Sequence, residues 1–196
     1  MTPDTRGSEA AVSFDPGSPY AIEHLTRALT RLTRNATSYF ESLPVQTFFA
    51  PQGDRWSPAD HVRHLRKSSA PLKVGFGLPV WLLRLMYGEA KAPSRTFEVL
   101  RSDYRSALAA GGQAGRFAPT PQGAPADPER RRAEILSRWG TTNEAVTTAW
   151  GKWRSLDLDR ARLPHPLLGK LTAREMAMFT VYHTSHHLTL VADRLA

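Results

Sequence analysis

Apolar residues recur at spacings of three and four along most of the chain, which is the period of an α-helix buried on one side. One such run begins at Tyr20 and continues until Pro44 ends it. No run of alternating apolar and polar residues between turn signals argues for a sheet. The pattern therefore predicts an all-α fold, a four-helix bundle with short additional helices. Further helical runs begin near 58, 94, 128 and 172.

Three of these runs carry a recognisable start signal. Ser57 and Asp127 are each followed by proline, which places a capping side chain before the residue type that fits the first helical position. Thr172 and Glu175 have the spacing of a capping box, in which each side chain satisfies the other's backbone donor. The helical runs near 58, 128 and 172 are therefore expected to start at these positions.

Other segments predict interruptions. The two glycines in 73–79 should break the second long helix, and the strongly apolar stretch 79–87 should form a short buried helix. Residues 111–126 are rich in Gly, Pro and Gln and predict a long crossover loop. We expect an irregular turn at 163–169, where two prolines flank His165.

The chain's 196 residues suit one domain with a sizeable core. Residues 1–17 are polar and contain Pro and Gly, so they predict a flexible N-terminal tail. Residues 18–196 then form a single helical bundle domain. No stretch is apolar enough to span a bilayer, and the N-terminus lacks a signal-peptide core, so we expect a soluble cytoplasmic protein without a membrane partner.

The amino-acid composition excludes some kinds of functional site. The chain has no cysteine, which excludes disulfides, thiolate ligands and a cysteine nucleophile of its own. The net charge of +8 could indicate nucleic-acid binding, but the basic residues are spread along the chain. The one tight run, 130–132, lies beside Glu129 and Glu134. This arrangement favours a solvated helix face over a nucleic-acid site.

The histidines are the most informative polar residues. His183 and His187 are four positions apart on the last predicted helix, so they face the same way and could clamp a metal. Hydrogen bonding to each other or to water is the alternative for an isolated pair. A third ligand should come from another helix, and His61 and His64 are the candidates. Helical periodicity alone favours His61, which lies closer to the apolar side.

Two segments carry a family resemblance. Residues 55–65 read RWSPADHVRHL, and residues 165–172 and 183–188 read HPLLGKLT and HTSHHL. They resemble the DinB-like family of DNA-damage-inducible four-helix bundles. The resemblance assigns the ligand position on the second helix to His64, against the periodicity, and the other two ligand positions to His183 and His187. His186 falls between these two and is no ligand in the family pattern.

The resemblance implies one divalent metal ion, zinc or nickel, held by the three histidines. Family members include thiol-dependent S-transferases and hydrolases, so a small-molecule substrate and a low-molecular-weight thiol are the expected partners. Three histidines with an open position suit a Lewis-acid centre that activates water or a thiol. Asp60 is a candidate to orient His64 or act as a base, although a carboxylate there also suits a helix start. His165 and His186 are candidates to contact a substrate or cofactor.

Three functions remain open. A metal-dependent hydrolase or small-thiol S-transferase is the first, and a non-catalytic metal- or ligand-binding protein of the stress response is the alternative. A nucleic-acid binder ranks last because no helix shows a clustered basic face. The last helix is apolar nearly all round, which suits either burial within the monomer or a homodimer contact.

Overall fold

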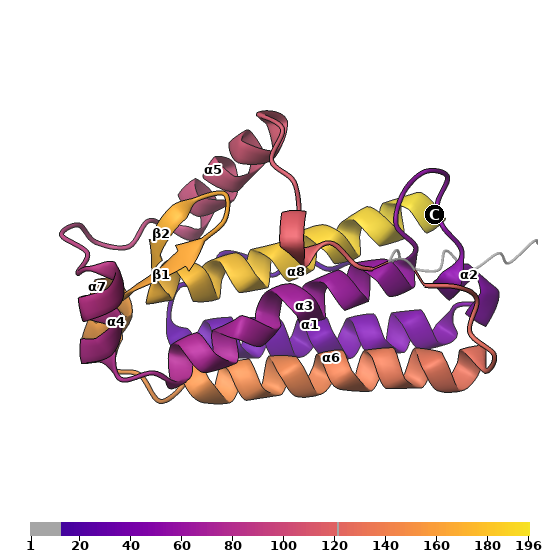
Figure 1. Ribbon diagram of the computed structural model, residues 1–196, viewed down its shortest axis with the longest axis horizontal. Helices are drawn as coiled ribbons and strands as arrows, with labels where there is room; N and C mark the ends of the chain where they lie inside the picture. The colour runs from indigo at the N-terminus through magenta and orange to yellow at the C-terminus, as the bar shows by residue number, and fades with distance from the viewer. Residues whose placement is uncertain (1–12, 121) are drawn as a thin grey trace, which may run out of the picture.

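Four long helices form a bundle in the computed structural model, which describes residues 13–120 and 122–196. Their axes run roughly along the long dimension of the molecule (Figure 1). Each helix packs against two others, α1 against α6 and α8, and α3 against the same two. The predicted all-α bundle is confirmed. The long helices are α1 (Ile22–Ser42), α3 (Pro58–Gly77), α6 (Pro128–Trp150) and α8 (Ala173–Leu195).

Shorter elements cover the ends and one side of this bundle. The helix α5 and a small β-hairpin lie on the side of α8, and α4 and α7 lie together at one end (Figure 1). The crossover between α5 and α6 contains one turn of 3-10 helix. The short elements are α2 (Val45–Phe49), α4 (Val80–Tyr87), α5 (Phe97–Ala109), η1 (Gly115–Phe117), α7 (Ser155–Arg160), β1 (Arg162–His165) and β2 (Gly169–Thr172).

The predicted helix starts are confirmed atom by atom. The side chain of Asp127 accepts a hydrogen bond from the backbone N–H of Arg130 at 3.0 Å. The hydroxyl of Thr172 accepts from the N–H of Glu175 at 3.1 Å, and the Glu175 carboxylate accepts from the N–H of Thr172 at 2.9 Å. These bonds satisfy donors that would otherwise lack a partner in the first turn. They fix where α6 and α8 begin, and hence where the α8 histidines lie.

Aromatic side chains fill the bundle interior. Trp139 and Trp150 of α6 and Phe40 of α1 are fully buried. The indole N–H of Trp150 donates to the hydroxyl of Thr26 at 2.8 Å, so its polar atom is satisfied inside the core. This packing joins α1 and α6 on the side of the bundle away from α5.

The predicted break at 73–79 is wrong for its first part, because α3 continues through Pro71 and Gly75 to Gly77. Gly75 has a packing role. A Cβ at this position would lie 3.1 Å from Cδ2 of Leu163, closer than most such contacts allow. The glycine therefore lets β1 approach α3, and the helix ends only where Leu78 and Pro79 follow.

The irregular turn predicted at 163–169 is instead part of an antiparallel hairpin. Arg162 pairs with Thr172, and His165 pairs with Gly169, whose φ of +73° suits glycine. Burial does alternate along β1, with Leu163 and His165 buried and Pro164 exposed. A four-residue strand that contains proline offers too few positions for this alternation to be read from the sequence.

The short helix expected at 79–87 is present, but the prediction that it is buried is wrong. Of its side chains only Leu83 is buried, while Trp81 and Leu85 are 67% and 76% exposed. The apolar residues of α4 surround the helix, so one face meets the protein and the other meets solvent.

Most of the predicted flexible tail, residues 1–12, lies outside the described residues. In the remainder, Phe14 is buried and its ring packs edge-on against Tyr39. Its carbonyl accepts a hydrogen bond from Ser185 at 2.8 Å. None of the helices in the described part of the chain is long and apolar enough to cross a bilayer.

Candidate metal centre

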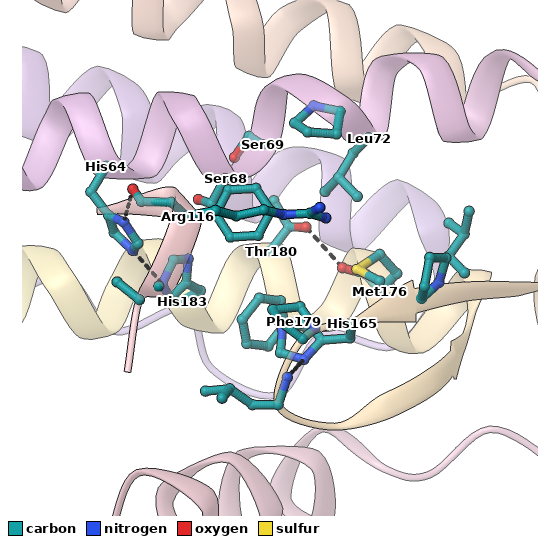
Figure 2. Close-up of a pocket in the computed structure, with 18 of the residues that line it drawn as sticks. His64, Ser68, Ser69, Leu72, Arg116, His165, Met176, Phe179, Thr180 and His183 are labelled. Atoms are coloured by element: carbon teal, nitrogen blue, oxygen red, sulfur yellow. Dashed lines mark hydrogen bonds between the residues drawn. The ribbon is translucent and has the colours of Figure 1, made fainter. Parts of the chain in front are cut away.

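Three histidines from two helices meet inside the bundle. His64 comes from α3, and His183 and His187 come from α8. All three are buried, and each offers a ring nitrogen within 4.8 Å of the other two. The Nε2 atoms of His64 and His183 are 3.1 Å apart, as are those of His183 and His187. Figure 2 shows the rings of His64 and His183 pointing toward each other across the two helices.

These separations suit a metal ion. Zinc binds imidazole nitrogen at about 2.0–2.1 Å, usually with tetrahedral angles, so two of its ligand nitrogens lie roughly 3.3–3.4 Å apart. The observed 3.1 Å separations need only a small adjustment to reach this value. The three-histidine donor set thus fits a divalent ion with at least one position left for another ligand.

A backbone carbonyl orients His64. Its Nδ1 lies 2.9 Å from the carbonyl oxygen of Phe117 in η1, and because a carbonyl only accepts, Nδ1 must carry the proton. The neutral ring then presents a lone pair at Nε2, toward the other two histidines. An imidazole that ligates a metal typically donates its other N–H in this way.

His61 plays a corresponding part beside His187. The two Nδ1 atoms are 2.8 Å apart, and both rings are buried. If His187 presents its Nε2 lone pair to the cluster, its Nδ1–H donates to Nδ1 of His61. His61 must then carry its own proton on Nε2, which is buried and has no hydrogen-bond partner among the described residues. Periodicity drew attention to His61, and the structure places it next to the cluster but outside the convergent group of three.

Burial holds the cluster in its neutral form. Desolvation lowers the pKa of His183 and of His187 well below the usual histidine value. It also lowers the pKa of His64, against the opposing effect of the bond to Phe117. Burial is the largest cause that lowers the pKa of His61, to about 3. Neutral imidazole is the form that binds metal ions.

Hydrogen bonds join the crossover segment to α3 beside the histidine cluster. The Lys67 ammonium donates to the carbonyl of Ala118 at 2.9 Å, and the Arg63 guanidinium donates to that of Thr120 at 2.6 Å. With the bond from His64 to Phe117, three side chains of α3 hold this segment. The predicted crossover loop is therefore a wall of the site.

Asp60 lies at the start of α3, and its carboxylate contacts Ser57 and Arg63. One carboxylate oxygen accepts from the hydroxyl and N–H of Ser57, which completes a capping box. The other oxygen accepts from Arg63 at 2.9 Å. No hydrogen bond joins Asp60 to His64 within the residues that the structure describes. Helix capping accounts for the contacts with Ser57, and an ion pair with Arg63 occupies the other carboxylate oxygen.

A cavity of about 1040 Å³ adjoins the cluster. It runs between α3, α8 and the hairpin (Figure 2). Both further candidates, His165 and His186, line it together with the three clustered histidines. Its walls are mainly apolar, and Trp56 covers the cluster with its ring centre 5.0 Å from that of His64. Apolar side chains on its walls include Leu72, Leu83, Leu167, Met176 and Phe179.

Some contributors to the site gave little signal in the sequence. Phe117 acts through its carbonyl, which every residue has, and only the fold brings it to His64. Lys67 follows His64 by three residues and Arg63 by four on α3, so a search for polar side chains at helical spacing could have found this pair. The partnership between His61 and His187 depends on which helices are neighbours.

Comparison with known proteins identifies the family to which the chain belongs. Searches of curated proteins and of solved structures gave no match. The family model described as the DinB superfamily matches residues 28–191, a span that includes α3, the crossover, the hairpin and nearly all of α8. The match therefore covers every residue of the histidine cluster, and the chain belongs to the DinB superfamily.

Proposed function

We propose that the protein binds one divalent metal ion through Nε2 of His64, His183 and His187 and uses the ion's open position for chemistry on a small molecule. The observation that carries this proposal is the convergence of three buried Nε2 atoms, with two separations of 3.1 Å. Zinc and nickel are the ions we expect.

Proton counting supports a cation between these atoms. The bond to Phe117 leaves Nε2 of His64 without a proton. One proton on His183 could be donated to His64 or to His187, and the other short contact would then bring together two nitrogens without a good hydrogen bond. A metal ion accepts all three lone pairs at once, so it removes a conflict that neutral histidines leave in place.

The cavity supports a reaction rather than metal storage. A bound divalent ion would supply a Lewis acid to a water, thiol or carbonyl oxygen in its open position. The chain's own residues provide the rest. The apolar walls exclude bulk water, and the crossover held by Lys67 and Arg63 closes one side. The cavity volume is at the upper end for pockets that take small molecules.

Two reactions fit this arrangement, hydrolysis of a small substrate and transfer of a small thiol to one. In the second reaction the nucleophilic sulfur must arrive on a separate molecule, because the chain has no cysteine. This is the reason to screen substrates both with and without low-molecular-weight thiols.

Cobalt substitution tests the proposal. Titration of metal-free protein with Co²⁺ should saturate at one ion per chain and give the visible absorption of a four- or five-coordinate ion. His64→Ala should abolish this spectrum, whereas His186→Ala is the matched control and should keep it. Azide or a small thiol should then shift the spectrum by entering the open position. A spectrum that neither ligand changes would indicate a closed site and a non-catalytic role.

A further inference from the structure

His165 has a fixed tautomer that the proposed metal chemistry does not require. Its Nδ1 accepts hydrogen bonds from the backbone N–H groups of Leu167 and Leu168, at 3.2 and 3.0 Å. Backbone N–H groups only donate, so Nδ1 carries no proton. Burial lowers the pKa of His165 to about 4, which keeps the ring neutral at pH 7. The proton of the neutral ring is therefore on Nε2.

The hairpin turn holds this ring rigidly. Both donors belong to the turn between β1 and β2, which Gly169 completes with a positive φ. The ring of Phe179 packs edge-on against it, with the ring centres 4.2 Å apart. The imidazole is thus fixed on two sides before any ligand enters.

The N–H on Nε2 is left for the cavity. His165 is 9% exposed, and its ring lines the cavity while Nδ1 is occupied by the turn. Within residues 13–120 and 122–196 no hydrogen-bond partner of Nε2 is found. By contrast, the hydroxyls of Ser68 and Thr180, which also line the cavity, donate to carbonyls of their own helices. The Nε2 atom is not itself fully buried, so its N–H reaches the open space of the cavity. A ligand that fills this space buries the N–H, and it avoids the cost of an unsatisfied donor only if it accepts a hydrogen bond there.

Phe179 connects this donor to the histidine cluster. Its ring stacks on His183 with centres 5.0 Å apart and an interplanar angle of 18°, and it contacts His165 on the other side. Figure 2 shows Phe179 and His165 together on the wall of the cavity. A molecule that lies along this wall would meet the cluster at one end and the His165 N–H at the other.

We infer that the cavity binds a predominantly apolar molecule whose carbonyl oxygen accepts a hydrogen bond from Nε2–H of His165. The apolar walls select the body of the molecule, and His165 selects the position of its oxygen. The inference rests on the proposed function only in that the other end of this molecule reaches the metal-binding histidines.

Benzophenone and diphenylmethane are matched probes, because they differ only in a carbonyl group in place of a CH₂. Their affinities for metal-free protein are measured by ligand-observed NMR titration, with the metal removed by chelation. The wild-type protein should bind the ketone about tenfold more tightly than the hydrocarbon, because both probes cover the His165 N–H but only the ketone gives it an acceptor. Equal binding of the two probes would overturn the inference without any variant.

Two substitutions separate a ligand contact from a structural role. The oxygen of His165→Asn lies near the original Nδ1 and can still accept from the turn, but the side chain lacks the distal donor. The amide N–H of His165→Gln lies near the original Nε2, while the turn loses its acceptor. The ketone preference should disappear in the asparagine variant and persist in the glutamine variant. The reverse result would show that His165 only stabilises the hairpin.

Because the probes are tested without metal, the two proposals can fail separately. Cobalt binding without the ketone preference would refute the role of His165 alone. A ketone preference in a protein that takes up no cobalt would refute the metal proposal and leave the cavity's preference for a carbonyl intact.

Discussion

Replacing His61 by leucine tests how the histidine cluster is oriented. Leucine has about the volume of histidine, so the change removes the 2.8 Å contact between the two Nδ1 atoms without opening a large cavity. His187 then has no acceptor that fixes its ring with Nε2 toward His64 and His183. We expect His61→Leu to weaken metal binding while the metal-free fold persists.

The size of the effect follows from the contacts. Loss of the hydrogen-bond partner of a metal ligand typically costs about 10- to 100-fold in affinity, which corresponds to about 1.4–2.8 kcal/mol. The metal-free protein should change little. Of these two rings, the wild type leaves Nε2 of His61 buried without a partner, and the variant instead leaves Nδ1 of His187 unpaired. These penalties are of the same kind, so the free energy of unfolding should stay within about 1 kcal/mol.

Competition with a chromophoric zinc chelator measures the affinity, and urea unfolding of chelator-treated protein measures the stability. His61→Asn is the matched control, because its side-chain oxygen can accept from His187 near the position of the original Nδ1. It should retain most of the affinity. Zinc binding by His61→Leu at wild-type strength would refute the argument that His61 orients His187.

Three further perturbations are informative. Because burial holds the pKa of His165 at about 4, below its value near 6.5 in the unfolded chain, the unfolded state takes up a proton first as the pH falls. Stability should drop between pH 6.5 and 4, by up to about 3 kcal/mol more in the wild type than in His165→Gln by chemical denaturation. Asp159→Asn removes the charge partner of the buried Arg174, 2.6 Å away, and should cost about 3–5 kcal/mol in the same assay. Lys67→Ala removes one tie to the crossover, so amide hydrogen exchange in 115–120 should become several-fold faster.

The sequence predicted what depends on local contacts. The caps at Ser57, Asp127 and Thr172 act within a single turn, so their spacing was enough to place three helix starts. The pairing of His183 with His187 is equally local, since residues four apart share a helix face. The structure contains both the three caps and the contact between His183 and His187.

Other features depend on contacts between distant segments. The wheel of α3 favoured His61 over His64, yet both are buried, because one faces His187 and the other faces His183 and Phe117. A single apolar direction cannot describe a helix whose polar side chains meet partners inside the bundle. The family motif separated the two histidines where periodicity could not.

The end of the molecule near α4 shows the same limit. Gly75 reads as a helix breaker in isolation, but its lack of a side chain admits Leu163 of the hairpin. The apolar residues of α4 suggested burial, yet Trp81 stays exposed because no described segment covers that face. Both outcomes depend on where the hairpin and α7 pack, which the local sequence does not encode.

Elemental analysis of protein purified without chelator or nickel affinity decides whether the three clustered histidines hold a metal ion. We expect about one zinc, nickel or similar ion per chain in the wild type and in His186→Ala, and loss of the ion in both His64→Ala and His183→Ala. Wild-type protein that contains no such ion and takes up neither zinc nor nickel on titration would refute the metal site, and the three histidines would then be neutral residues of the bundle core.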